Sequence, residues 1–142
     1  QDNPRYADPL DLLCWTLLET TFAEEGFTAN GDHAISPTVL SSLEQNLAGG
    51  IAPQALAREA GMSLSSLRRR WAKVYGSMTF SDYRDKVFLQ KSKRLLIESD
   101  APVKAIAGML GFADPYYFCR KFRQLAGETA GEYRKKHFYP FK

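Results

Sequence analysis

Two short stretches of this sequence place arginine beside small or aromatic side chains at a spacing that puts them on one helical face. The residues that share this outward face are Ser65, Arg68, Arg69 and Ala72 in the first stretch, and Tyr116, Cys119, Arg120 and Arg123 in the second. An arginine fork matches the N7 and O6 acceptors of guanine, and a small side chain such as Ser65 or Ser66 permits close approach to a groove about 12 Å wide. The chemistry that these residue types allow is recognition of base edges in duplex DNA.

An internal repeat with a period of about 50 residues contains both stretches. Residues 54–63 read QALAREAGMS and residues 104–113 read KAIAGMLGFA, so each copy predicts a short helix that glycine ends. Gly61 and Gly111 stand where the chain must turn sharply, because glycine enters the left-handed region without a steric penalty. Each copy is therefore expected to turn just before a second helix.

That second helix carries the outward residues in each copy. In the first copy Ser63 is a natural N-cap of this helix. In the second copy Asp114 is the N-cap and Pro115 takes the first helical position. The apolar residues agree between the copies with an offset of one residue and are predicted to face inward: Leu67, Trp71 and Val74 match Phe118, Phe122 and Leu125, and Gly76 matches Gly127. Two helices joined by a tight glycine turn, with arginine exposed on the second, form the helix-turn-helix pattern.

The remaining segments also predict helices, and no stretch indicates a β-strand of any length. Residues 81–98 lack glycine and proline and are rich in lysine and arginine, which predicts one long linker helix between the copies. An amphipathic helix is expected at about 9–25. The predicted fold is all-α, with two helix-turn-helix subdomains at about 53–75 and 102–126, joined by the long linker helix and preceded by an acidic N-terminal helical segment.

Charge sets the first 35 residues apart from the rest of the chain. Residues 1–35 hold seven acidic residues and one basic residue, whereas residues 36–142 hold 18 basic and nine acidic residues. The boundary is expected between residues 35 and 36, and Ser36-Pro37 should begin a helix that ends at Gly49-Gly50. The basic remainder favours a polyanionic partner.

Composition and cysteine content exclude several classes of protein. The chain has 142 residues, of which 44% are hydrophobic and 25% are charged, as in an ordinary globular domain. Cys14 and Cys119 have no cysteine or histidine near them in the sequence, so they predict neither a disulfide framework nor a zinc site. A reducing compartment fits this cysteine usage, and no apolar run reaches the roughly 20 residues of a membrane helix.

The repeat also contains the signature of a known family. The second copy and the segment after it carry Ile106-Ala107, Gly111-Phe112, Tyr117-Phe118, Arg120-Lys121-Phe122, Gly127, Thr129 and Tyr133-Arg134, and the first copy carries Leu56-Ala57, Gly61-Met62-Ser63, Leu67, Arg69, Trp71 and Gly76. With these residues, the segment 36–137 resembles the DNA-binding domain of AraC/XylS-type transcriptional regulators. The resemblance implies sequence-specific binding of operator or promoter DNA, with two recognition helices in successive major grooves.

Carried over by position, the resemblance implies two sets of DNA-contacting residues. Those expected to read bases are Ser65, Arg68, Arg69, Pro115, Tyr116, Cys119 and Arg120; those expected to contact phosphates are Arg70, Lys73, Lys121, Arg123 and Arg134. Arg69 and Arg120 hold equivalent places, so each could instead anchor its motif through an internal ion pair. Cys119 is interpreted as a small interface residue and not as a redox switch, since no second thiol is near it in the sequence.

Several positions depart from the family pattern, and one extra residue lies between Gly76 and Tyr83. The linker helix has Phe88 where arginine is usual and Ser92 where alanine is usual, and Ala130 replaces the usual proline before the last helix. These differences concern the packing of the linker helix and leave the recognition positions unchanged.

The resemblance also implies further partners. Such regulators usually carry an effector or dimerisation domain before the DNA-binding half, and because the chain begins at Gln1 and not at methionine, we expect a further part of the protein upstream. Residues 1–35 are interpreted as its last element or as a connector. Besides DNA, the expected partners are RNA polymerase and a second copy of the chain, bound through the upstream domain or the helix at 9–25. The expected location is the bacterial cytoplasm or nucleoid.

No enzyme, cofactor, metal or membrane function is predicted. The sequence contains no His-Glu-x-x-His, no Gly-x-Ser-x-Gly and no phosphate-binding glycine loop, and neither cysteine has a recognisable catalytic partner. The alternative to DNA binding is a helical protein-interaction module that acts through the apolar helix at 9–25. Salt separates these two functions, because binding through phosphates weakens as salt rises.

Overall fold

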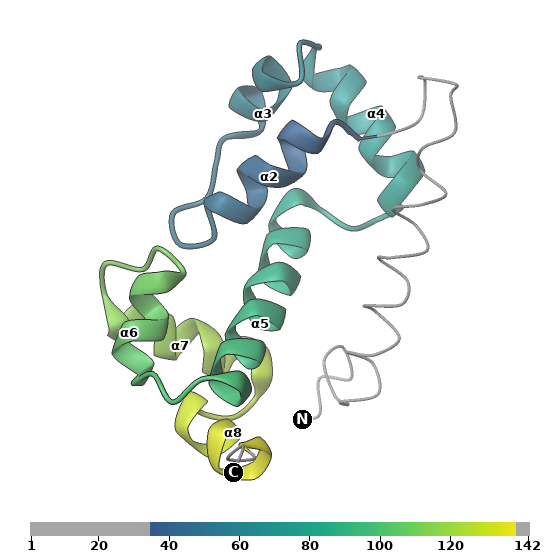
Figure 1. Ribbon diagram of the computed structural model, residues 1–142. Coiled ribbons are helices and arrows are strands. Elements are labelled where there is room, and N and C mark those ends of the chain that lie inside the picture. The colour runs from purple at the N-terminus through teal and green to yellow at the C-terminus, as the bar shows by residue number, and fades with distance from the viewer. Residues whose placement is uncertain (1–34, 139–142) are drawn as a thin grey trace. The chain divides into compact units, whose positions relative to one another are not determined.

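The computed structural model describes residues 35–138, which form seven helices and no strand (Figure 1). The helices are α2 (Pro37–Gln45), α3 (Pro53–Glu59), α4 (Leu64–Tyr75), α5 (Phe80–Glu98), α6 (Val103–Met109), α7 (Pro115–Ala126) and α8 (Ala130–His137). The predicted all-α fold with two helix-turn-helix motifs and a long helix between them is confirmed for this part of the chain. The acidic helix expected at 9–25 lies outside the described residues.

The described chain divides into two compact units. Unit 1 contains residues 35–40 and Ala52–Met78, and therefore α3 and α4. Unit 2 contains Ser41–Ile51 and residues 79–138, and therefore the end of α2 and all of α5 to α8. Each unit thus holds one of the two predicted motifs.

The two motifs repeat the same backbone turn. In unit 1 the amide of Met62 donates to the carbonyl of Ala57 at 3.0 Å, and in unit 2 the amide of Phe112 donates to the carbonyl of Ala107 at 2.9 Å. The glycine before each of these amides has a positive φ, 66° at Gly61 and 82° at Gly111. These are the two positions at which the sequence predicted a left-handed glycine.

α2 begins where expected but ends four residues earlier than predicted. The hydroxyl of Ser36 accepts a hydrogen bond from the amide of Thr38 at 3.3 Å. The expectation that the helix ends at Gly49-Gly50 was wrong, because α2 ends at Gln45. The amide side chain of Asn46 donates to the carbonyl of Ser42 at 2.7 Å, and such a local side-chain bond competes with the regular helix.

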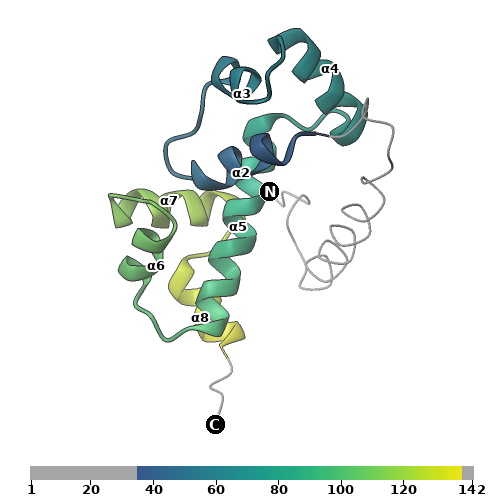
Figure 2. The same cartoon turned by 45° about the horizontal axis from the view of Figure 1, so that its top comes forward.

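A cluster of aromatic rings forms the core of unit 2. Figures 1 and 2 show α6, α7 and α8 gathered around α5, and these helices contact one another. The ring of Phe88 on α5 is fully buried and lies 5.2 Å from the ring of Phe112 and 5.5 Å from the ring of Phe118. Phe122 continues the cluster at 6.2 Å from Phe118. The phenylalanine that departs from the family pattern is therefore a core residue of unit 2.

The second departure in the linker helix is also buried. Ser92 has no exposed surface, and its hydroxyl has no hydrogen-bond partner among the residues that the structure describes. A buried hydroxyl without a hydrogen bond lowers the stability of the fold, because it has lost its contacts with water. An alanine at the same place has no hydroxyl and avoids this penalty. The family's usual alanine is therefore the more favourable side chain in this environment.

One residue predicted to face inward does not. Val74 of α4 is 47% exposed, whereas its counterpart Leu125 of α7 is partly buried. The last turn of α7 is covered because α7 packs on α5, α6 and α8, while the main neighbour of α4 within residues 35–138 is the short helix α3. Val74 and Leu125 therefore match in the sequence repeat but differ in burial, so the last turns of α4 and α7 are not packed alike.

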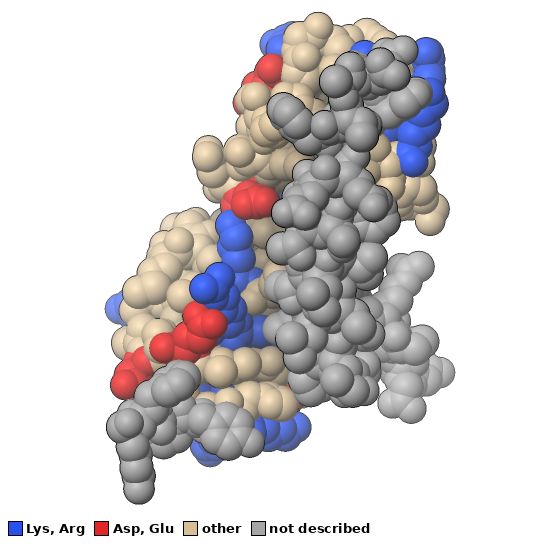
Figure 3. All heavy atoms as spheres, turned by 45° about the vertical axis from the view of Figure 1, so that its right-hand side comes forward, with Lys and Arg blue, Asp and Glu red and all other residues tan. Residues whose placement is uncertain are grey.

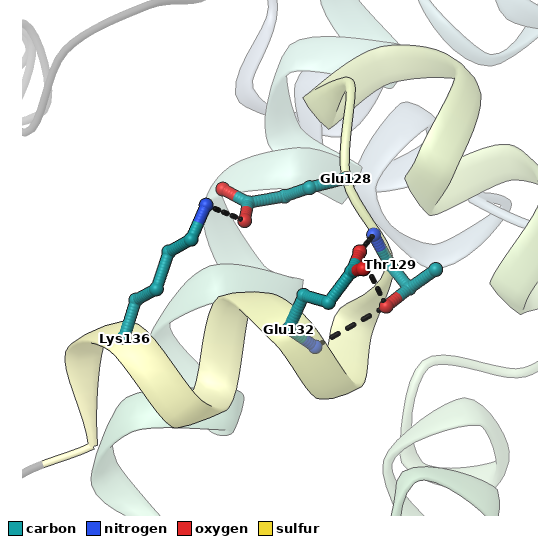
Figure 4. Close-up of polar contacts among 4 residues, drawn as sticks. All are labelled: Glu128, Thr129, Glu132 and Lys136. Atoms are coloured by element: carbon teal, nitrogen blue, oxygen red, sulfur yellow. Dashed lines mark hydrogen bonds and ion pairs between the residues drawn. The ribbon is translucent and has the colours of Figure 1, made fainter.

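The turn into α8 is held by polar side chains (Figure 4). The hydroxyl of Thr129 accepts a hydrogen bond from the amide of Glu132, whose carboxylate accepts from the amide of Thr129 at 2.9 Å. Next to this capping box, the ammonium group of Lys136 lies 2.7 Å from the carboxylate of Glu128. The hydrogen bond from the Thr129 amide, with smaller contributions from its hydroxyl and from nearby Arg123 and Lys136, lowers the pKa of the Glu132 carboxyl.

This lowered pKa predicts a loss of stability in acid. A carboxyl group whose pKa is lower in the folded state stabilises the fold above its unfolded pKa, and this contribution disappears as the pH falls through the folded pKa. We expect Glu132→Gln to weaken the decline in stability between about pH 6 and pH 3. Urea unfolding of both proteins across this range measures the effect, and parallel stability curves would contradict it.

Candidate nucleic-acid interface

α4 presents a polar, basic face because its opposite face is buried in unit 1. The hydroxyl of Ser63 caps the helix by accepting from the amide of Ser66 at 3.2 Å. Leu67 and Trp71 are buried, and the indole of Trp71 donates to the carbonyl of Met78 at 2.7 Å, which fixes the rotation of the helix. The outward positions predicted from the sequence, Ser65, Arg68, Arg69 and Ala72, are all exposed.

α7 presents the matching face in unit 2. The carboxylate of Asp114 caps the helix by accepting from the amide of Tyr116 at 2.9 Å, and Phe118 and Phe122 are fully buried. Pro115 begins the helix and is partly exposed. The predicted outward positions of this copy, Tyr116, Cys119, Arg120 and Arg123, are all exposed.

The two equivalent arginines do not serve as internal anchors in the described part of the chain. Neither Arg69 nor Arg120 forms an ion pair with another of residues 35–138. The guanidinium group of Arg120 lies 6.0 Å from the ring centre of Tyr117, a neighbour on its own helix. Of the two roles that the sequence left open, the geometry favours contact with an external ligand.

Three of the five phosphate candidates are placed where such contacts are feasible. Lys73 and Arg123 are exposed near the ends of α4 and α7, and Arg70 is partly exposed. On the face drawn in Figure 3, basic side chains gather in one column at the upper right with no acidic side chain among them. A surface of this kind attracts a polyanion.

Lys121 is used inside unit 2 and does not fit its predicted phosphate role. Its side chain is only 11% exposed, and its ammonium group lies 2.9 Å from the carboxylate of Asp85 on α5. It also donates to the carbonyl of Leu47 at 3.3 Å and lies 5.1 Å from the ring centre of Phe88. Because reaching a phosphate would break these contacts, we interpret Lys121 as a residue that holds α7 against α5.

Arg134 is likewise committed to the fold. Its guanidinium group donates to three backbone carbonyls at and beyond the end of α5, those of Leu96 at 3.2 Å, Ser99 at 3.4 Å and Ala101 at 2.6 Å. The carbonyl of Leu96 is among the last acceptors of α5, and those of Ser99 and Ala101 lie in the segment after it, so the arginine satisfies backbone groups that would otherwise need water. We therefore interpret Arg134 as a residue that holds α8 against the end of α5, and its contact with phosphate stays a prediction.

The position of Lys121 leads to a prediction that separates stability from binding. We expect Lys121→Ala to lower the free energy of unfolding by about 2 kcal/mol, between the values for exposed and buried ion pairs. The slope of log Kd against log salt for DNA should stay unchanged. Arg123→Ala is the matched control, because this exposed arginine on the same helix should keep the stability and lower the slope by about one unit. The reverse pattern would restore Lys121 as a phosphate contact.

Sequence reasoning missed one basic residue beside α7. A groove of about 530 Å³ in unit 2 is lined by Ser81, Arg84, Asp85, Tyr117, Arg120, Lys121, Gln124 and Leu125. The guanidinium group of Arg84 rests against Gly50, whose φ is +75°, and its Nε atom is buried with no hydrogen-bond partner among the described residues. Cations outnumber carboxylates in this groove, and its one carboxylate, Asp85, is already paired with Lys121. The groove therefore suits an anion. Arg84 of α5 and Arg120 of α7 are far apart in the sequence and line the same groove only in the folded protein, so sequence patterns could not identify Arg84.

Neither a metal site nor a membrane-spanning helix is found within the described residues. No three histidine, cysteine, aspartate or glutamate side chains within residues 35–138 gather as a metal site. Cys119 is a free, exposed thiol, and Cys14 lies outside the described residues. None of the helices in this part of the chain is long and apolar enough to cross a membrane.

Comparison with known proteins places this geometry in a family. Residues 56–136, more than half of the chain, match the model of a family described as helix-turn-helix domain. The transcriptional regulator YijO of Escherichia coli K12 is 28% identical over 110 residues, which cover 78% of this chain and 38% of that protein. The transcriptional activator RhaS of Escherichia fergusonii is 32% identical over 97 residues, which cover 68% of this chain and 34% of that protein. The chain thus spans little more than a third of the length of these relatives.

A solved structure agrees with the same assignment. The DNA-binding domain of the global transcriptional factor AdpA, determined in complex with a target DNA, is 28% identical and has a TM-score of 0.56. The match covers 70% of this chain and 87% of that domain. Together with the two repeated motifs, the long helix α5 and the family match, these similarities show that the chain belongs to the AraC/XylS family of helix-turn-helix transcriptional regulators.

Proposed function

We propose that the chain binds double-stranded operator or promoter DNA sequence-specifically and regulates transcription, with α4 and α7 entering successive major grooves. The observation that carries this proposal is the recurrence of one exposed face on two helices whose caps, buried pairs and turns correspond. A single helical hairpin with exposed arginine is common, but two copies with corresponding faces are hard to explain by packing alone. Membership of the family adds independent support.

Within this function the side chains divide into two groups. The residues proposed to read bases are Ser65, Arg68, Arg69, Pro115, Tyr116, Cys119 and Arg120, and the residues proposed to contact phosphates are Arg70, Lys73, Arg123 and the newly found Arg84. Contacts of the first group specify the sequence, whereas contacts of the second group position the protein and make its affinity depend on salt.

The proposal extends to the organisation of the whole protein. We take residues 36–142 as the DNA-binding domain and residues 1–35 as a connector to an effector or dimerisation domain. RNA polymerase and a second copy of the chain are proposed as partners, and the bacterial cytoplasm or nucleoid as the location. No catalytic activity is proposed, since the relatives that the chain matches are regulators.

The proposal is tested by selecting bound duplexes from a random DNA pool and titrating the selected duplex at several salt concentrations. We expect enrichment of one motif with two blocks about one helical turn apart, and an affinity that falls steeply as salt rises. Enrichment of one block would show that one recognition helix suffices. No enrichment, together with binding to proteins that salt does not weaken, would favour the interaction module instead.

A further inference from the structure

The two recognition helices can be compared residue by residue. Both α4 and α7 have 12 residues, with an oxygen cap before the first residue and a glycine of positive φ after the last. The buried residues Leu67 and Trp71 of α4 stand at the same helical positions as Phe118 and Phe122 of α7. Because the same helical positions are buried in both helices, the same positions also face outward. Side chains at equivalent outward positions can therefore be compared directly as contacts to a ligand.

At these equivalent positions the chemistry of the two helices differs. The second and fifth residues are Ser65 and Arg68 in α4, but Tyr116 and Cys119 in α7. The sixth residue is arginine in both helices. At these three positions α4 offers a serine and two arginines, whereas α7 offers an aromatic ring, a thiol and one arginine. The second exposed arginine of α7, Arg123, stands at the ninth position, three residues beyond Arg120, where α4 has Ala72.

Tyr116 is exposed to a degree that packing does not explain. It is 81% exposed, and its ring contacts no other ring within residues 35–138. The adjacent Tyr117, by contrast, packs its ring 5.7 Å from that of Phe112. Cys119 lies one helical turn after Tyr116 and is exposed as well, so the two side chains form one apolar strip along the outward face of α7.

The major groove contains one apolar feature that could match such a strip. Thymine carries a C5 methyl group at the edge of the groove, whereas guanine offers two acceptors that suit an arginine fork. We infer that α7 recognises a DNA block in which thymine methyl groups lie against Tyr116 and Cys119, and that α4 recognises a guanine-containing block through Arg68 and Arg69. This inference rests on the proposed DNA binding and names the base chemistry of each block.

Two chemical replacements in the selected duplex test the inference with the full chain. Replacing thymine by deoxyuridine removes only the methyl group, and we expect it to weaken binding about fourfold at each contacted thymine of the α7 block. Replacing guanine by 7-deazaguanine removes the N7 acceptor, and we expect it to weaken binding roughly tenfold in the α4 block. The Arg120→Ala and Arg68→Ala variants assign the blocks to the helices.

Matched variants connect each effect to its side chain. On the Tyr116→Ala protein, deoxyuridine at the thymine that Tyr116 contacts should cost nothing further, whereas Tyr116→Phe should keep the full methyl effect because it keeps the ring. If Tyr116→Phe instead weakens specific and random DNA equally, the tyrosine hydroxyl contacts a phosphate and the inference for α7 is wrong. If deoxyuridine has no effect in either block while sequence-specific binding persists, the inference fails and the proposed function stands. Absence of any sequence preference would overturn the proposed function itself.

Discussion

Replacing Phe88 by alanine is expected to lower the free energy of unfolding by about 3 to 5 kcal/mol, the range for removal of a buried aromatic ring. Phe88 has no exposed surface and contacts the rings of Phe112 and Phe118, while the ammonium group of Lys121 lies above its own ring. The truncation therefore leaves a cavity at the junction of α5, α6 and α7. A loss of this size is a large part of the 5 to 15 kcal/mol that stabilises a typical domain.

Urea unfolding followed by circular dichroism measures this loss. Tyr116→Ala is the matched control, because it removes an aromatic side chain that is 81% exposed and should change the stability by less than about 0.5 kcal/mol. Phe88→Arg, which restores the side chain usual in the family, should destabilise more than Phe88→Ala, since it brings a second cation beside Lys121 into the buried cluster. A stable arginine variant would show that the ring cluster is not the core of unit 2.

Local sequence patterns predicted most of the fold and the orientation of both recognition helices. Gly61 and Gly111 have the positive φ expected from their places in the repeat, and Leu67 and Phe118 are buried as their spacing indicated. Such features depend on neighbours within one or two helical turns, so the sequence contains the information directly. Spacing also identified the exposed face on each recognition helix.

Contacts between distant segments could not be predicted in this way. Lys121 and Arg123 are both basic residues on α7, yet within residues 35–138 Lys121 forms an ion pair, with Asp85 of α5, and Arg123 forms none. The sequence predicts Arg134 as a phosphate contact, but in the fold it donates to the carbonyl of Leu96 near the end of α5 and to that of Ala101 in the segment that follows. A charge count cannot separate a lysine that binds phosphate from one that binds its own protein, because the difference depends on which helix packs beside it.

The double variant Arg69→Ala/Arg120→Ala is expected to lose about 2 to 6 kcal/mol of binding free energy on the selected duplex. Each arginine is exposed on its own recognition helix, and neither forms an ion pair within residues 35–138. One arginine that contacts guanine with both arms of its fork contributes about 1 to 3 kcal/mol to discrimination. The two residues belong to separate motifs and share no partner, so their contributions should add if both helices engage the same DNA molecule.

Titration of the two single variants and the double variant on specific and random duplexes measures this additivity. Arg94→Ala is the control for the change in charge, because Arg94 is exposed on α5 and already paired with Glu98, so its loss should not alter the preference for the selected sequence. Additive losses confined to the specific duplex require two recognition helices in contact with one operator. If the double variant binds no more weakly than the weaker single variant, only one motif reads bases, and the second serves to position the domain on the phosphate backbone.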